Sequence, residues 1–297
     1  MTMADVQWHE RRELRDPILV CAFKGWNDAG EAASAAVEFL CESFDAEPLA
    51  DIDPEDFYDF TAVRPTVRLV EGRTRAIDWP ENSFHAAVVP AAHRDLIMLR
   101  AAEPSLRWKA YCDAVLEVVR ETGAGMIVTL GALLADVPHS RPVGITGLAS
   151  TDGMVERLGF ERTSYEGPTG IVGVLHATCA AAGIDSVSLW APVPHYVAAT
   201  PNPKAALALV RGFEGIAGIA VDATALETAS EDYDRQVTAA VSTDPDVKAF
   251  VERLEEMADE LSEEEGPLEE QLPSGDVIAR EFQRFLRQRG PDGPAGA

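Results

Sequence analysis

The stretch "PILVCAFKGWNDAGEAASAAVEFL", residues 17–40, decides the fold. Residues 18–23 form an uninterrupted apolar run that predicts a buried strand, and a helical pattern follows from 29 to 44. A strand that passes through a short turn into a helix is typical of layered α/β proteins. The turn contains Gly25, Trp26, Asn27 and Asp28, so the sequence raises the question whether this turn binds something or only packs and caps.

Similar units continue to about residue 221. Further apolar runs without polar alternation predict strands at 96–101, 126–130, 143–149 and 185–190, and helical patterns occupy 106–122, 169–182 and 204–215. Such runs suit a sheet that is buried on both faces and connected through helices. Residues 64–79, "RPTVRLVEGRTRAIDW", alternate polar and apolar side chains around Glu71-Gly72 and predict a solvent-facing antiparallel hairpin. The pattern therefore predicts a layered α/β domain with a mixed sheet.

The composition changes after residue 221, where strand signals end and acids accumulate. Residues 231–270 contain 15 Asp or Glu against Arg235, Lys248 and Arg253. Two amphipathic patterns, 245–265 and 274–290, predict an acidic and a basic helix, and we expect them to form an antiparallel hairpin. A solvated helical face and a surface for calcium or a basic partner both remain open, although no EF-hand spacing occurs. We expect an α/β domain at 1–221, a helical extension at 222–290 and a disordered tail at 291–297.

The whole chain has 297 residues and a net charge of −25. Because DNA and anionic lipids attract clustered Lys and Arg, this charge argues against nucleic-acid and membrane-surface partners. The polar start "MTMADVQWHERRELRD" does not resemble a signal peptide, and the longest apolar stretch is too short to span a bilayer. The four cysteines, Cys21, Cys41, Cys112 and Cys179, are scattered among apolar neighbours, which predicts buried thiols. We expect a cytoplasmic protein.

The turn after the first predicted strand has two interpretations. Asp28 stands where a helix N-cap belongs and Glu31 follows three residues later, so the two predict a capping box. Gly25 suits a backbone angle that other residues avoid. Capping does not explain Trp26 and Asn27. The carboxyl end of a parallel strand is where α/β proteins bind ligands, so these two residues also suit a ligand site. Neither GxGxxG nor GxxxxGK[ST] is present, so both capping and an anion cradle remain open.

Two other loops carry polar side chains after predicted strands. "ADVPHSRP" (135–142) contains His139, Ser140 and Arg141, and "APVPHYVAATPNPKA" (191–205) contains His195 and Tyr196. The repeated "VPH" predicts that both histidines lie at the same edge of the sheet. A triad of Ser140, His195 and Asp136 is conceivable, but no G-x-S-x-G elbow and no metal-ligand spacing occur. The alternative is that these turns cap strands and pack at a subunit interface, and we expect no metal and no cofactor.

A third polar stretch, "SYEGPTG" (164–170), precedes a predicted helix. It contains Tyr165, and Pro168-Thr169 is the predicted N-cap of that helix.

Four stretches together resemble the proteasome assembly chaperone 2 family in its actinobacterial-type branch. They are "GWNDAGEAAS" (25–34), "GALLADVPHSRPVGITG" (131–147), "YEGPTGIVGVLH" (165–176) and "VPHYVAATPNPKA" (193–205). The resemblance implies a three-layer α/β/α sandwich, similar to the phosphorylase/hydrolase-like fold, with a helical extension. Eukaryotic members assist assembly of the proteasome α-ring without known catalysis. They carry a C-terminal hydrophobic–Tyr–X signature, whereas this sequence ends "GPDGPAGA".

We therefore expect a non-catalytic protein-binding or assembly protein whose partners are proteasome subunits or another protein. The alternative is an enzyme or binding protein for a nucleoside-like ligand at the carboxyl edge of the strands. The residues expected at this ligand or partner edge are Gly25, Trp26, Asn27, Asp28, His139, Arg141, Tyr165, Thr169, His195 and Tyr196.

We also expect the chain to associate with itself as a dimer or trimer. Aromatic side chains near strand ends, among them Trp108 and Trp190, are of the kind that interfaces favour. We expect the domain before residue 222 to make the contact, because the acidic helices would repel each other.

Overall fold

The computed structural model describes residues 6–70, 73–158, 160, 166–197 and 200–264. The strands are β1 (Val6–Trp8), β2 (Ile18–Lys24), β3 (Glu47–Ile52), β4 (Thr66–Val70), β5 (Thr74–Asp78), β6 (Asn82–Ala87), β7 (Leu96–Ala102), β8 (Met126–Ala135), β9 (Thr146–Ala149) and β10 (Asp185–Pro194). The α-helices are α1 (Ala32–Ser43), α2 (Trp108–Thr122), α3 (Asp152–Leu158), α4 (Ile171–Ala182), α5 (Pro203–Ala217), α6 (Thr224–Val241) and α7 (Pro245–Glu264). Two short 3-10 helices are η1 (Ala29–Glu31) and η2 (Pro54–Asp56).

One mixed sheet carries the domain, with strand order β1-β3-β6-β7-β2-β8-β10-β9. β2 lies between β7 and β8 and is parallel to both, and β10 is parallel to β8. The carboxyl ends of these four strands therefore meet at one edge of the sheet, which we call the carboxyl edge. The five apolar runs that predicted strands are all strands. β8 and β10 continue beyond their predicted ends because they pair with each other as far as Ala135 and Pro194.

Three strands, β1, β3 and β6, are not predicted by the sequence patterns. They extend the sheet beyond β7 as an antiparallel segment. β1 has only 3 residues, and β3 begins with two exposed residues before its buried ones. Short strands with one exposed end lack the continuous apolar run that predicts a fully buried strand.

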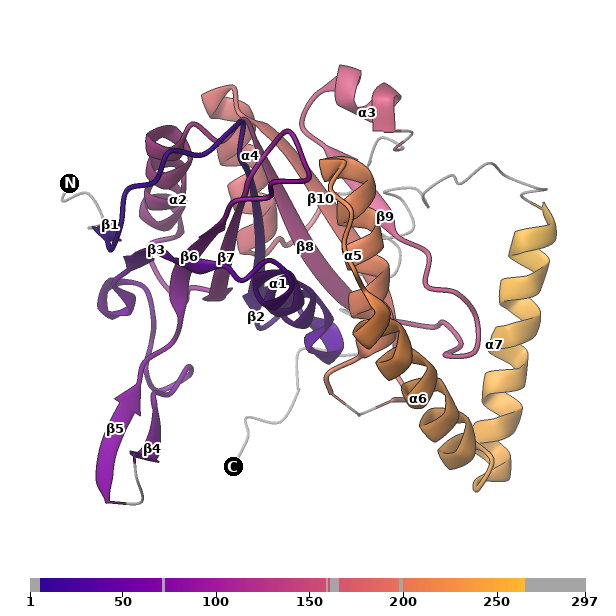
Figure 1. The fold of residues 1–297 in the computed structure, drawn as a ribbon. Coiled ribbons are helices and arrows are strands. Elements are labelled where there is room, and N and C mark those ends of the chain that lie inside the picture. The colour runs from indigo at the N-terminus through magenta and orange to yellow at the C-terminus, as the bar shows by residue number, and fades with distance from the viewer. Residues whose placement is uncertain (1–5, 71–72, 159, 161–165, 198–199, 265–297) are drawn as a thin grey trace.

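Helices cover both faces of the sheet, as expected for a three-layer α/β/α sandwich (Figure 1). On one face α1 and α5 bury side chains such as Leu40 and Phe213 against the strands. On the other face α2 and α4 bury side chains such as Val115 and Leu175. The alternate residues Leu19 and Val20 of β2 belong to these two different cores. This placement explains why the central strand is apolar at every position from 18 to 23.

The predicted hairpin is present as β4 and β5, which pair antiparallel and form a separate two-stranded sheet. It projects from the body of the domain (Figure 1). We call its described residues, 64–70 and 73–79, the arm.

The helical extension begins with α6, which the sequence patterns do not predict. Its buried positions are Ser230, Tyr233 and Val237, a stripe with too few apolar residues to be recognised from hydrophobic periodicity. α7 matches the predicted acidic helix. The predicted basic helix at 274–290 and the tail at 291–297 lie outside the described residues. Within the described residues, no helix combines the length and the apolar composition needed to cross a bilayer.

Candidate functional site

The turn after β2 starts at Gly25, whose φ of 132° is rarely adopted by residues with a side chain. A Cβ at this position would also lie 3.3 Å from the Cβ of Glu103. Gly25 lines a cavity of about 680 Å³ at the carboxyl ends of β2 and β7, and the basic residues of its lining are Lys24, Arg64 and Arg100. Arg100 is paired with Glu38 at 2.6 Å, so this cation already has an internal partner. Glycine at this turn is therefore explained by backbone geometry.

The buried carboxylate of Asp28 caps helix α1. Its Oδ1 accepts the N–H groups of Ala33 at 2.8 Å and Ser34 at 3.1 Å, and its Oδ2 accepts the hydroxyl of Ser34 at 2.6 Å. Burial raises the pKa of Asp28, and the hydrogen bonds from Ser34 and Ala33 oppose that shift. The side chain of Asp28 caps α1 as predicted, although the N-cap position of α1 is Glu31, and the predicted capping box with Glu31 is wrong. Glu31 is exposed and has a φ of 49°, so it separates η1 from α1 instead of completing a capping box.

Asn27 joins three elements at the carboxyl edge. Its Nδ2 donates to Glu103 Oε1 at 3.0 Å, and its carbonyl oxygen accepts the N–H of Ala132 in β8 at 2.8 Å. The same Glu103 oxygen accepts the N–H of Ile171, the first residue of α4, at 2.9 Å. A Cβ on Gly170 would lie 2.3 Å from Asn27 Nδ2, so only glycine permits this approach. Asn27 and Glu103 therefore hold β2, β8 and α4 together.

Trp26 and Thr169 are further predicted residues of this part of the edge. Trp26 is half-buried in the same turn. Thr169 is exposed, and the N-cap position of α4 is Gly170, so the predicted cap at Pro168-Thr169 is wrong. Glu103 takes that role, because its carboxylate reaches the first N–H of the helix. Tyr165 lies outside the described residues.

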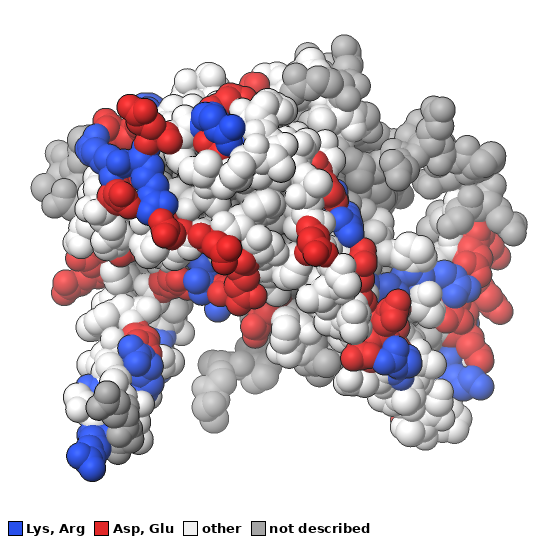
Figure 2. All heavy atoms as spheres, viewed as in Figure 1, with Lys and Arg blue, Asp and Glu red and all other residues white. Residues whose placement is uncertain are grey.

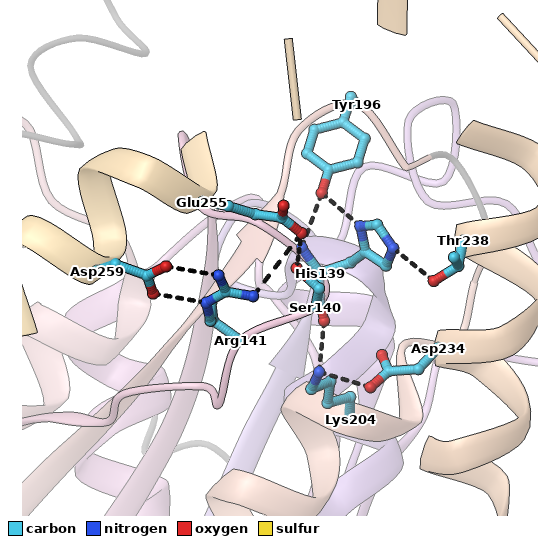
Figure 3. A network of polar contacts seen from close by, with 9 residues as sticks. All are labelled: His139, Ser140, Arg141, Tyr196, Lys204, Asp234, Thr238, Glu255 and Asp259. Atoms are coloured by element: carbon cyan, nitrogen blue, oxygen red, sulfur yellow. Dashed lines mark hydrogen bonds and ion pairs between the residues drawn. The ribbon is translucent and has the colours of Figure 1, made fainter. Parts of the chain in front are cut away.

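The two "VPH" loops meet at Tyr196, as Figure 3 shows. Tyr196 Oη accepts the backbone N–H of His139 at 2.7 Å and lies 2.8 Å from His139 Nδ1. His139 Nε2 lies 3.0 Å from Thr238 Oγ1 in α6. A neutral ring protonated at Nε2 satisfies both contacts, with the Tyr196 hydroxyl donating to Nδ1. Burial is the main reason that the pKa of His139 is lowered, in agreement with a neutral ring.

His195 lies beside this network. Its Nδ1 is 3.0 Å from Asp136 Oδ1, and its ring makes edge contacts with Tyr196 and with Phe250 of α7. Ser140 donates its hydroxyl to Glu255 of α7. The conceivable triad is therefore not assembled, because the serine hydroxyl is directed at a carboxylate of the extension.

Arg141 and Lys204 bind the extension through ion pairs (Figure 3). The guanidinium of Arg141 makes a two-pronged contact with Asp259 of α7, at 2.7 and 2.6 Å. This contact lowers the pKa of Asp259 and raises that of Arg141. Lys204 Nζ donates to Asp234 of α6 at 2.7 Å and to the carbonyl oxygen of His139. The cations of the edge therefore neutralise acids of the extension.

A further tie fixes the loop before α5. Asn202 caps α5 by accepting the N–H of Ala205 at 3.0 Å, and its Nδ2 donates to Tyr233 Oη of α6 at 3.0 Å. Asn202 also donates its backbone N–H to the carbonyl oxygen of Gly30 at 2.7 Å. The loops after β2 and β10 and the helix α6 thus form one hydrogen-bonded unit.

The structure therefore brings together His139, Arg141, His195 and Tyr196 at one part of the carboxyl edge, under α6 and α7. Gly25, Asn27 and Asp28 lie in the neighbouring turn. Sequence reasoning missed Glu103, Lys204 and the residues of the extension that contact the edge. Glu103 had a signal, since it directly follows a predicted strand. Over the described ranges, no group of three His, Cys, Asp or Glu side chains is arranged to hold a metal ion.

The fold and the site define a class: an α/β/α protein whose carboxyl-edge loops are bound by its own helical extension. Residues 22–241 match the PAC2 family model, and the chain belongs to the PAC2 family. The chain is 43% identical to a PAC2 family protein from Streptomyces avermitilis MA, with a TM-score of 0.75, covering 80% of this chain and 100% of the other.

Two further structures extend the comparison. The proteasome-assembly chaperone homologue Rv2125 of Mycobacterium tuberculosis is 41% identical with a TM-score of 0.73, covering 79% of this chain and 99% of the other. The archaeal proteasome activator PbaB of Pyrococcus furiosus is 19% identical with a TM-score of 0.67, covering 81% of this chain and 99% of the other, and shares the fold. A search of the curated proteins found no match.

Proposed function

We propose that this protein is a non-catalytic protein-binding factor that assists assembly of an oligomeric partner, similar to proteasome assembly chaperones. The observation that carries the proposal is the state of the carboxyl edge. His139, Arg141 and Tyr196, which would hold a small ligand, contact Thr238 of α6 and Asp259 and Phe250 of α7 instead. The likeness to a proteasome-assembly chaperone homologue at 41% identity supports proteasome subunits as the partner.

Self-association is the second part of the proposal. The chain forms a dimer or trimer, because closed symmetric assemblies are the usual form of soluble homo-oligomers. Among the described residues, half of the large apolar side chains that the structure leaves exposed lie in the arm, namely Val67, Leu69, Ile77 and Trp79. Contiguous exposed apolar surface is typical of protein interfaces.

The test uses purified proteasome α- and β-subunits from the organism that encodes this chain. The full-length protein is added at equimolar concentration, and the mixture is followed by native gels and light scattering. We expect a complex with α-subunits and a several-fold faster appearance of assembled particles. An acidic protein of similar pI serves as the control for charge alone.

Two results would contradict the proposal. One is an unchanged assembly time course in which the α-subunits elute alone. The other is a saturable thermal stabilisation by nucleosides or phosphate that disappears in Arg141→Ala, since a ligand must stabilise the folded state that binds it.

A further inference from the structure

The arm has one apolar face that its own chain leaves exposed. In the register of β4 and β5, Val67 lies opposite Ile77 and Leu69 lies opposite Arg75. Side chains alternate between faces along a strand and opposite residues share a face, so Val67, Leu69 and Ile77 lie on one face together with Arg75 near the tip, and Trp79 continues the alternation after β5. These four apolar side chains are between 54% and 63% exposed. An isolated two-stranded hairpin is marginally stable in water, so such a face favours a partner.

The arm is also basic in an acidic protein. Residues 64–79 contain four Arg and two acids, a charge of +2, and the remainder of the chain must carry −27 because the whole carries −25. Figure 2 shows blue side chains along the arm and both red and blue ones on the neighbouring body. Arg68 is paired with Asp78 at 2.9 Å. Arg73 and Arg75, at the tip, pair with no carboxylate in the part of the chain that the structure describes.

A cleft of about 820 Å³ lies at the root of the same arm. Its lining includes five carboxylates and, among the described residues, no Lys or Arg; Asp51, Asp78 and Glu81 are paired with His9, Arg68 and Arg100 outside the lining, and Asp53 and Glu55 have no ion pair there. Phe60 and Trp79 form an aromatic pair in it, with ring centroids 5.0 Å apart. Ile77 and Trp79 line both the cleft and the apolar face of the arm, so the two surfaces are continuous.

The tip of the arm is not placed to fill its own cleft. Each strand of the arm has 5 residues, so the tip lies roughly 16 Å from the root at about 3.3 Å per residue. Basic tip and acidic cleft are complementary surfaces at opposite ends of one element. Such surfaces match when two arms lie side by side in opposite directions.

We infer that the arm of one copy docks against the arm of a second copy, with its basic tip in the acidic cleft at the partner's root. Because tip and cleft belong to the same arm, a two-fold arrangement makes the contact twice, as in the isologous dimers that dominate among homo-oligomers. The apolar faces then cover each other between the two charged contacts. This inference rests on the self-association proposed above and names the surface that produces it. The arm contact pairs opposite charges, so repulsion between the acidic helices of the extension does not act in this contact.

The first experiment replaces apolar side chains of the full-length protein. Leu69→Glu places a charge in the arm face, and Leu261→Glu is the matched control, because Leu69 and Leu261 are 63% and 62% exposed. Light scattering over a concentration series gives the dimer dissociation constant. We expect Leu69→Glu to raise it at least about tenfold, as for a central interface residue, and Leu261→Glu to leave it unchanged.

The second experiment exchanges the charges. A tip variant carries Arg73→Glu and Arg75→Glu, and a cleft variant carries Asp51→Lys and Glu55→Lys. Each variant alone sets like charges against each other, so we expect a monomer. An equimolar mixture pairs the acidic tip with the basic cleft and the basic tip with the acidic cleft, so we expect the dimer to return. Thermal melts within about 2 °C of the original protein establish that the variants fold.

The outcomes separate this inference from the proposal on which it rests. If both variants remain dimeric, the arm is not the interface, while self-association stands. If the mixture stays monomeric, the cleft is not what the tip binds, and the inference is overturned. If the original protein is monomeric at micromolar concentration, arm docking and self-association both fail, while the assembly assay with proteasome subunits still tests the function by itself.

Discussion

Replacing Asp28 by alanine removes three hydrogen bonds at the start of α1, and we expect a large loss of stability. The carboxylate accepts two N–H groups, from Ala33 and Ser34, and the Ser34 hydroxyl, all within 3.1 Å. An exposed cap contributes about 0.5–2 kcal/mol, and an unsatisfied buried donor costs about 1–3 kcal/mol. The burial that raises the pKa of Asp28 also makes its charge costly. Together these effects predict that Asp28→Ala lowers the free energy of unfolding by about 2–4 kcal/mol.

Urea unfolding followed by circular dichroism measures this loss, and two variants sharpen it. Asp28→Asn keeps one carbonyl acceptor and should lose about half as much. Glu31→Gln is the control, because the exposed Glu31 makes no capping hydrogen bond and should change stability by less than about 0.5 kcal/mol. If Asp28→Ala changes stability by less than that amount, the capping account is refuted. If Glu31→Gln is as destabilising as Asp28→Ala, the capping box is restored.

The pH dependence of the same pair gives a second check. The folded-state pKa of Asp28 is raised above 3.8, so the folded protein holds this proton more strongly than the unfolded chain. The proton-linked part of the stability is therefore present at low pH and is lost as pH rises from 3.8 through the folded-state pKa, while the hydrogen bonds that the ionised carboxylate accepts remain. The stability of the original protein relative to Asp28→Asn should decline over that window. A difference that grows with pH would contradict the raised pKa.

Three further predictions concern the histidines, the contacts of Tyr196 and Arg141, and the cysteines. Burial lowers the pKa values of His85, His139 and His176 below 6.5, so their contribution to stability is present above that pH and is lost as pH falls. Urea unfolding at pH 7.5 and 5.5 should show a lower free energy of unfolding at the lower pH, and His139→Gln should make that difference smaller. Tyr196→Phe leaves the His139 N–H without its acceptor and should lower the free energy of unfolding in urea by about 1–3 kcal/mol. Arg141→Ala breaks an exposed ion pair and should lower it by at most about 1 kcal/mol. The four buried thiols, two with pKa values raised to about 12, should not react with a thiol reagent at pH 8 until urea unfolds the chain; rapid reaction in buffer would contradict their burial.

The parallel core of the fold could be predicted because its signals are local. β2, β7, β8 and β10 are buried on both faces, so each appears as an apolar run between helical patterns. The antiparallel strands β1 and β3 could not be recognised this way, because β1 has only 3 residues and β3 begins with two exposed residues. Helix α6 was missed for a related reason. Its buried stripe contains a serine and a tyrosine, whose burial depends on what packs against them.

The candidate site could be predicted only in part. The repeated "VPH" after two strands predicted that His139 and His195 share an edge, and both contact Tyr196 there. What these residues contact could not be predicted. Arg141 binds Asp259, which is 118 residues away in sequence, and Lys204 binds Asp234, 30 residues away. No local pattern specifies such pairs, because many Asp and Glu residues of the extension occur at similar spacings along the chain.

The amino-acid sequence by itself determined the layered α/β class, the position of the central strands, the projecting hairpin and the acidic character of the extension. These properties follow from periodicity and charge, which are set by neighbours along the chain. Only the tertiary structure decided that Asp28 caps through Ala33 and Ser34, that Glu103 joins Asn27 to α4, and that α6 and α7 cover the edge. These contacts depend on which side chains the packed elements bring within hydrogen-bonding distance, and that distance is a property of the folded chain.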